Sequence, residues 1–173
     1  MRRALVAAIA LALAAGCSPS VSRDESFQPM VVGDRAPAYA ALTLAGDSVR
    51  VGAGTPVLLN VWATWCESCR EEMADLGTLS RKYAPRGVKV VAVSVDKGDG
   101  TRVKRFAEAE KLPFTVAHDP AGEVQQTFQA VGVPETYLVS GDGTLLWIRR
   151  GGLAGAGEEV YAGLDSAVAK LGR

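Results

Sequence analysis

The chain has 173 residues, of which 48% are apolar, and this is typical of one globular domain with some additional sequence. Its 19 basic and 19 acidic residues cancel, and no basic run is interleaved with aromatic residues. A nucleic-acid partner is therefore not expected, because neutralising phosphates requires clustered Lys and Arg.

The first sixteen residues have the pattern of an export signal. Arg2 and Arg3 precede the uncharged stretch at residues 4–15, which is followed by a glycine and Cys17. A helix that spans a bilayer needs roughly 20 apolar residues, so this stretch is too short for a permanent anchor. The positive start, short apolar middle and small-residue end predict a signal peptide at residues 1–16.

The residues around Cys17 resemble the lipobox of bacterial lipoproteins, in which the signal is cut before a cysteine that then carries lipid. The segment reads "LAAGCS", with Ala14 where the usual pattern has leucine. An exported chain with three cysteines has an odd one left over, and lipidation of Cys17 leaves the single pair Cys66 and Cys69. We therefore expect an extracytoplasmic (periplasmic-side) protein, attached to the membrane by a lipid on Cys17. Secretion with a free Cys17 is the alternative.

The leader is followed by an expected tether and then by the folded domain. Residues 17–37 are rich in Ser, Pro and charge and show little periodicity, which predicts a tether, with the domain at residues 38–173. The domain begins with a predicted hairpin at residues 39–44 and 48–51. Residues 56–64 form a nearly unbroken apolar run, as expected of a strand covered on both faces.

The remaining elements follow from hydrophobic periodicity. Residues 67–83 have apolar side chains at helical spacing, and residues 88–96 form a second buried strand. The rest predicts a helix at 101–111, a turn and short helix at 119–130, a hairpin at 135–140 and 144–150, and a closing helix at 156–171. This order predicts an α/β fold with a central mixed sheet and helices on both faces.

The stretch "NVWATWCESCREEM" contains the two cysteines that carry the chemistry. Cys66 lies where a buried strand gives way to a helix, whose first turn has unpaired N–H groups and a partial positive charge. Both stabilise a thiolate, the reactive form of cysteine. Cys69 returns to the same face one turn deeper. The first sulfur is thus placed to attack a foreign disulfide, and the second to resolve the mixed disulfide.

Three other uses of the two cysteines remain open at this point. A purely structural disulfide would close a very small loop and would constrain the unfolded chain little. A structural zinc site needs four ligands, and the chain has no second cysteine pair and one histidine. A copper site built from Cys66, Cys69 and His118 fits the preference of Cu(I) for thiolates. The position of His118 in "AHDP" is, however, also that of an ordinary turn residue.

The segments "NVWATWCESC" and "GVPETYLV" together resemble the thioredoxin superfamily. Within it, residues 32–171 resemble the membrane-tethered extracytoplasmic reductases of the TlpA/ResA/CcmG type. The resemblance implies a thioredoxin fold with an N-terminal β-hairpin extension and an insert between Cys69 and Pro134. It also implies a thiol:disulfide reductase that cycles its Cys-x-x-Cys pair without a cofactor or a metal.

The resemblance assigns roles to individual residues. Cys66 would be the exposed nucleophile, and Cys69 the resolving thiol. Trp65 matches the tryptophan that flanks the nucleophile. Pro134 matches a cis-proline opposite the active-site cysteines, and the backbone of Val133 before it would pair with the substrate.

Glu72 is the candidate for acid–base work. Thioredoxins usually have a buried Asp where this chain has Asn60, and an amide cannot transfer a proton. Glu72 lies three residues after Cys69 on the same helical face and matches a glutamate of the subfamily. A partly buried carboxylate there would take the proton of Cys69 during resolution. A solvated helix acid like Glu71 would have no such role.

The direction of electron flow stays open, because the dipeptide between the cysteines lacks the proline that is common in relatives. Glu67 disfavours a neighbouring thiolate, whereas Arg70 favours it. The expected direction is reduction, with electrons arriving from a membrane thiol carrier of the CcdA or DsbD kind. They would pass to a protein disulfide, for example in an apocytochrome c awaiting haem or in an oxidised copper-site assembly protein.

Three alternative functions follow from the same residues. An oxidase that donates disulfides differs from a reductase only in redox potential. A copper-binding chaperone would use Cys66, Cys69 and His118 without enzymatic turnover. A peroxidase is disfavoured, because Thr64 is one residue too close to Cys66 for the Thr-x-x-Cys of peroxiredoxins.

Overall fold

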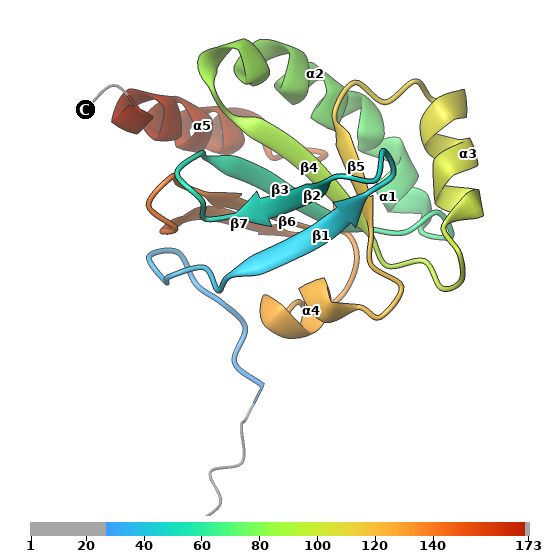
Figure 1. Cartoon of the computed structure of the whole chain (residues 1–173). Coiled ribbons are helices and arrows are strands. Elements are labelled where there is room, and N and C mark those ends of the chain that lie inside the picture. Colours follow the sequence, from blue (N-terminus) through green and yellow to red (C-terminus); the bar gives the residue numbers. More distant parts are fainter. Residues whose placement is uncertain (1–26, 172–173) are drawn as a thin grey trace, which may run out of the picture.

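The computed structural model describes residues 27–171, which are built around a single mixed β-sheet (Figure 1). Its strands are β1 (Tyr39–Thr43), β2 (Ser48–Val51), β3 (Val57–Trp62), β4 (Lys89–Ser94), β5 (Thr115–His118), β6 (Glu135–Val139) and β7 (Leu145–Arg150). Their order is β2-β1-β5-β4-β3-β6-β7, with β3, β4 and β5 parallel and the neighbouring pairs antiparallel. The leader and Cys17 lie outside the described residues, so lipidation stays a prediction.

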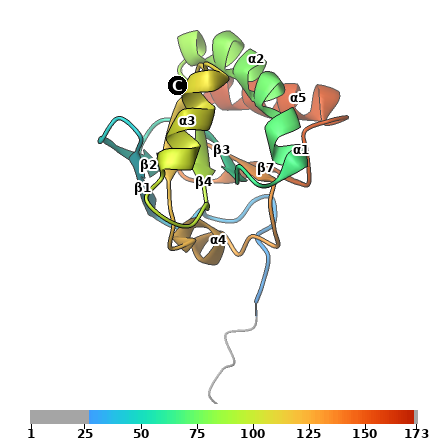
Figure 2. The ribbon, with the colours of Figure 1, turned by 90° about the vertical axis from the view of Figure 1, so that its right-hand side faces the viewer.

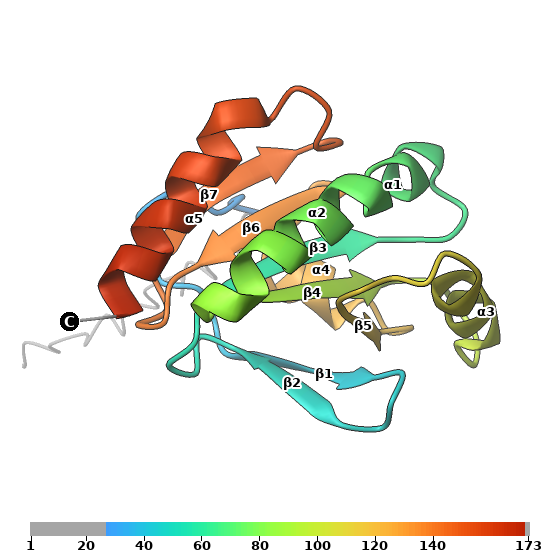
Figure 3. The same ribbon diagram turned by 90° about the horizontal axis from the view of Figure 1, so that it is seen from above.

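Helices cover both faces of the sheet, as the sequence predicts. They are α1 (Glu67–Glu71), α2 (Met73–Tyr83), α3 (Thr101–Ala109), α4 (Glu123–Thr127) and α5 (Gly157–Leu171), with a short 3-10 helix at Ala84–Arg86. Helices α2 and α5 lie over one face and α4 lies on the other, whereas α3 stands beyond the end of β4 (Figure 3). The predicted α/β architecture is confirmed. Within the described part of the chain, no helix has the length and apolar character that crossing a bilayer requires.

Strand β3 is the centre of the fold, because β4 pairs with one of its edges and β6 with the other. All six of its residues are buried, which explains the nearly unbroken apolar run of the sequence. Asn60 is the polar exception in this strand, and it is fully buried. Buried amides need hydrogen-bond partners, and Asn60 finds them among the residues of the functional site.

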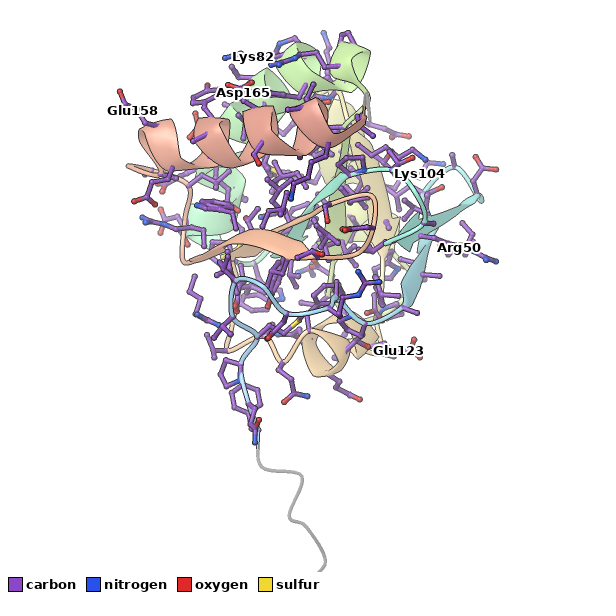
Figure 4. The ribbon with its side chains drawn as sticks, turned by 90° about the vertical axis from the view of Figure 1, so that its left-hand side faces the viewer. Arg50, Lys82, Lys104, Glu123, Glu158 and Asp165 are labelled. Carbon is purple, nitrogen blue, oxygen red and sulfur yellow. A yellow bond between two sulfur atoms is a disulfide. The ribbon has the colours of Figure 1, made fainter. Side chains whose placement is uncertain are left out.

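A polar and aromatic cluster joins α2 to α5. The guanidinium of Arg86 forms an ion pair with Asp165 at 2.6 Å, and the Tyr83 hydroxyl donates to the same carboxylate at 3.2 Å. The ammonium of Lys82 lies 4.2 Å from the centre of the Tyr161 ring. Figure 4 shows Lys82 and Asp165 close to each other on the two helices. The cluster secures the C-terminal end of α2, which is the end away from α1.

Strand β5 is an element that the sequence did not predict. It lies between β1 and β4, pairing Leu42 with His118 on one side and Ser94 with His118 on the other. Its four residues include only Val116 and Ala117 as buried apolar positions, too few for periodicity to reveal a strand. His118 is therefore the last residue of a strand, and its expected place in a turn is wrong. Together α3 and β5 form the insert between β4 and α4.

The helix predicted at residues 67–83 is interrupted at Glu72. Helix α1 ends before this residue and α2 begins after it, with Glu72 itself at φ −78° and ψ −7°. The backbone still continues from one helix to the next, because the Leu76 N–H donates to the Glu72 carbonyl at 3.0 Å. At this junction Glu72 lies on the buried side, and it is only 3% exposed.

The N-terminal segment of the described chain is docked on β7. The Gly33 N–H donates to the Leu145 carbonyl, and the Leu145 N–H donates to the Asp34 carbonyl, each at 2.8 Å. Met30 is 7% exposed and belongs to the hydrophobic core. The described end of the segment expected as a tether is thus part of the folded domain, which begins earlier than the predicted boundary.

A domain that starts at residue 38 is expected to be less stable than one that starts at residue 27. It loses the backbone hydrogen bonds to β7 and the burial of Met30, and we expect the free energy of unfolding to fall by roughly 2 to 4 kcal/mol. Urea unfolding of the two proteins, both with the Cys66–Cys69 disulfide intact, measures the difference. Equal unfolding midpoints with equal slopes would contradict the structural role of the segment.

Candidate active site

Cys66 occupies the N-cap position of α1, directly after the loop that leaves β3. It forms a disulfide with Cys69, and the two Cα atoms are 5.2 Å apart. Cys66 is 8% exposed, whereas Cys69 is fully buried. The Cys69 N–H donates to the Cys66 sulfur at 3.2 Å, and the Ser68 hydroxyl lies 3.6 Å from it. These donors favour negative charge on the Cys66 sulfur after reduction.

The loop before Cys66 is fixed by a carboxylate from the neighbouring strand. Asp96 follows β4 and accepts hydrogen bonds from both the backbone N–H and the hydroxyl of Thr64. It also accepts one from the Ser94 hydroxyl at 2.7 Å. Burial alone would raise the pKa of Asp96, but these hydrogen bonds outweigh it and hold the pKa below its ordinary value. The carboxylate is therefore charged at neutral pH.

Arg70 completes the support of the same loop from the helix side. Its guanidinium donates to the Thr64 carbonyl at 2.9 Å. Both backbone polar groups of Thr64 are thus bonded, two residues before the nucleophile. From the sequence, Arg70 was expected only as a charge near the thiolate, and Asp96 was not predicted as a site residue. The available signal was an acidic residue at the end of a buried strand, "VVAVSVD".

The Val133–Pro134 peptide bond is cis, as the resemblance implied. Glu135 begins β6 directly after it and pairs with Val61 of β3. The proline therefore lies at the same edge of the sheet as the loop that leads from β3 to Cys66. Trp65 is 61% exposed at this edge. The structure thus brings the cysteine loop and the proline loop together.

Glu135 is a buried carboxylate that holds the proline loop, and it was not recognised from the sequence. It accepts a hydrogen bond from the Val131 N–H at 2.9 Å and forms an ion pair with the Arg150 guanidinium at 3.1 Å. A buried charge without such a partner would be strongly destabilising. Glu135 is part of the segment "GVPETYLV", but its role depends on its contact with Arg150 of β7, which the segment alone does not reveal.

Glu72 lies at the junction of α1 and α2, and both of its carboxylate oxygens accept hydrogen bonds. The Asn60 amide donates to one oxygen at 2.7 Å, and the Leu153 N–H donates to the other at 2.8 Å. Burial raises the pKa of Glu72 from 4.5 to about 7, although these two hydrogen bonds act to lower it. The carboxyl group therefore exchanges its proton near neutral pH. The expectation of a buried acid one turn after Cys69 agrees with this position.

Asn60 connects Glu72 to the sheet. Besides its bond to Glu72, its amide donates to the Thr136 hydroxyl of β6 at 2.9 Å. Its carbonyl oxygen is buried without a hydrogen-bond partner among the described residues. Asn60 cannot transfer a proton itself, but it holds the group that can.

The side chain of His118 is hydrogen-bonded to a backbone carbonyl group and does not join the two cysteines in a metal site. Its Nε2 atom lies 2.8 Å from the Asp96 carbonyl, and its ring packs under Gly100, where a Cβ would lie 2.7 Å from Nδ1. Between residues 27 and 171, no group of three or more His, Cys, Asp or Glu side chains is placed to hold a metal ion. The structure brings Cys66 and Cys69 together but supplies no third ligand from this part of the chain.

The mixed sheet, the Cys-x-x-Cys pair at the first turn of α1 and the adjacent cis-proline define the class of protein: a thioredoxin-fold thiol:disulfide oxidoreductase. A sequence model of the AhpC/TSA family matches residues 32–148. The chain belongs to this family of thioredoxin-like proteins.

Individual relatives agree with this placement. The thiol-disulfide oxidoreductase ResA of Bacillus thuringiensis subsp. konkukian is 33% identical over 121 residues, which cover 69% of each chain. The thioredoxin-like protein YneN of Bacillus subtilis is 33% identical over 117 residues, covering 65% of this chain and 68% of YneN. Among solved structures, a putative thiol:disulfide interchange protein DsbE from Chlorobium tepidum has a TM-score of 0.73 and 29% identity, covering 80% of this chain and 99% of its own.

Proposed function

We propose that the protein reduces disulfides of client proteins outside the cytoplasm. The observation that carries this proposal is the arrangement of three groups: Cys66, which is 8% exposed at the first turn of α1, a fully buried Cys69 one turn behind it, and a buried Glu72 carboxyl whose pKa burial raises to about 7. Relatives named ResA and DsbE support the thiol:disulfide chemistry.

The proposed reaction is two successive thiol–disulfide exchanges. The Cys66 thiolate attacks one sulfur of the client disulfide, which forms a mixed disulfide and releases the first client thiolate. Cys69 then loses its proton to Glu72 and attacks the Cys66 sulfur, which releases the second client thiolate. Two electrons pass from the dithiol to the client, and Cys66 and Cys69 end as the disulfide seen in the structure.

The cellular setting of this reaction is also part of the proposal. We infer that the chain carries lipid on Cys17 and works at the extracytoplasmic side of the membrane, which the leader pattern supports. The resemblance to TlpA/ResA/CcmG-type reductases supports an electron donor of the CcdA or DsbD kind. It also supports clients such as apocytochrome c or a copper-site assembly protein. The disulfide-donating oxidase would require a Cys66–Cys69 pair far more oxidising than the glutathione pool.

The Cys69→Ala variant, expressed in its native envelope, is expected to accumulate client proteins covalently bound to Cys66, because the mixed disulfide cannot be resolved. Mass spectrometry of the trapped, reducible complexes identifies the clients. The double variant Cys66→Ser/Cys69→Ala is the matched control and should trap nothing. An empty Cys69→Ala trap, or a Cys66 thiol that resists alkylation in the folded reduced protein, would contradict the proposed reaction.

A further inference from the structure

An open groove of about 460 Å³ lies beside the nucleophile, between the loop that carries Trp65 and the insert helix α3. Trp65, 61% exposed and directly before Cys66, forms one wall. The first turns of α3 and the loop that follows β4 form the rest. Figure 2 faces this end of the molecule, with α1 and α3 both turned toward the viewer. Because Trp65 is the residue directly before Cys66, a client bound at Cys66 can extend into this groove.

Two arginines of α3 line the groove with positive charge that no acidic group of the described chain pairs with. Arg102 and Arg105 are three residues apart on the helix and therefore share a face. Neither guanidinium has a hydrogen bond or an ion pair with the described part of the chain, although Arg102 helps to lower the pKa of Asp96. Arg105 is thus the freer of the two charges. Lys97 adds a third positive charge, with its ammonium bonded to the Pro120 carbonyl at 2.7 Å.

The two carboxylates in the groove are already engaged by the protein itself. Asp99 accepts a hydrogen bond from the Thr101 N–H at 3.0 Å, at the start of α3. Asp96 accepts the hydrogen bonds from Thr64 that hold the nucleophile loop. The acidic groups of the groove are therefore hydrogen-bonded within the protein, whereas the two guanidinium groups are available to bind a partner.

We propose that this groove binds an acidic segment of the client protein next to the disulfide under attack. A client carboxylate pairs with Arg105 and Arg102, and the client backbone packs against the exposed Trp65 ring. Guanidinium groups suit this purpose because they form planar, two-point contacts with carboxylates. The proposal rests on the proposed reductase function. It specifies in addition that the preferred clients carry acidic residues next to the disulfide.

The test compares two disulfide-containing peptides that differ only in the residues flanking the reactive cysteine, Glu in one and Lys in the other. The reduced wild-type protein, in a single turnover, is expected to reduce the acidic peptide with a second-order rate constant on the order of tenfold higher than for the basic peptide at low salt. The ratio should fall as salt is raised, because screening weakens exposed ion pairs. The double variant Arg102→Gln/Arg105→Gln should lose most of this ratio.

Lys104→Gln is the matched control, because it removes one charge from the same helix but on another side. Lys104 lines a separate hollow beside the β1–β2 hairpin, and Figure 4 labels it there. This variant should keep the wild-type ratio. Each ratio compares two peptides on the same protein. A variant that is less active in general therefore keeps the same ratio, and only a change in charge preference alters it. Equal rates for the two peptides on the wild-type protein, or an unchanged ratio in the arginine variant, would overturn the proposal.

A small neutral disulfide, 2-hydroxyethyl disulfide, separates this proposal from the one on which it rests. If the wild-type protein reduces the neutral disulfide but does not discriminate between the peptides, the groove assignment is wrong and the reductase function stands. If the reduced wild-type protein reduces none of the three, the proposed function itself is contradicted.

Discussion

Replacing Glu72 with Gln is expected to slow resolution of the mixed disulfide by roughly tenfold to a hundredfold at pH 8, because Cys69 loses its proton acceptor. The glutamine side chain keeps one oxygen, which can accept from the Leu153 N–H, and its NH2 group can donate to the otherwise unpaired carbonyl oxygen of Asn60 once that amide turns over. The change therefore removes the proton exchange with little change of shape. In the wild-type protein, resolution should rise with pH through about 7, the pKa to which burial raises Glu72. In the variant this inflection should disappear.

Reaction with an aromatic disulfide separates the two exchanges. The first chromogenic thiol is released when Cys66 attacks, and the second when Cys69 resolves the mixed disulfide. Only the second release should slow in Glu72→Gln. Glu71→Gln is the matched control, since Glu71 is the exposed neighbour. Unchanged kinetics of the second release across pH 6 to 9 would remove Glu72 from the mechanism.

The same substitution should change how stability depends on pH. The pKa of Glu72 is about 7 in the folded protein, above its ordinary value of 4.5, so the folded state binds the proton more tightly than the unfolded state. The stabilisation from the proton is therefore complete below pH 4.5 and is lost as pH rises through about 7. Urea unfolding should show the wild-type protein losing stability over this interval, relative to the Glu72→Gln variant.

Replacing Asp96 with Ala is expected to lower the free energy of unfolding by about 3 kcal/mol, because it leaves the buried Thr64 N–H and hydroxyl without their acceptor. The loop that carries Trp65 and Cys66 loses its attachment to β4. We therefore also expect slower attack by Cys66 on a client disulfide. Chemical denaturation and the first release of chromogenic thiol measure the two effects.

Ser94→Ala serves as the control for Asp96→Ala. It removes the hydrogen bond from the Ser94 hydroxyl to the Asp96 carboxylate and the one that this hydroxyl accepts from the Asp96 N–H, but leaves both bonds from Thr64 in place. Because the folded pKa of Asp96 is lowered, the stability it contributes is present above about pH 4 and is lost as pH falls through the folded value. The stability difference between wild type and Asp96→Ala should therefore shrink in acid. A difference that persists unchanged there would show that packing, and not charge, carries the effect.

Local patterns were enough to predict the centre of the fold. The buried strand β3 and the hairpin of β6 and β7 follow from apolar runs and turn residues, and the reactive pair follows from the spacing of Cys66 and Cys69. The cis form of Pro134 was predicted through family resemblance. Strand β5 was missed because two buried residues after a proline give no clear period, and its pairing with β1 is a tertiary contact.

The supporting carboxylates show the limit of sequence reasoning. The role of Asp96 depends on Thr64, 32 residues earlier, and the role of Glu135 depends on Arg150 in the next strand. The position of Glu72 was predicted, but the bonds to Asn60 and Leu153 that fix its orientation were not. Such contacts arise when strands and loops meet at one edge of a sheet, and no local period encodes them.

The insert of α3 and β5 brings a consequence for evolution and for engineering. The reacting groups Cys66, Cys69 and Glu72 lie on α1 or at its two ends, whereas the two arginines of the groove lie on α3. On the role proposed for the groove, exchanging α3 for the corresponding helix of a relative is expected to change the client preference and to leave the sulfur chemistry unchanged. Substitutions confined to this one helix would then be enough to redirect the protein toward other clients.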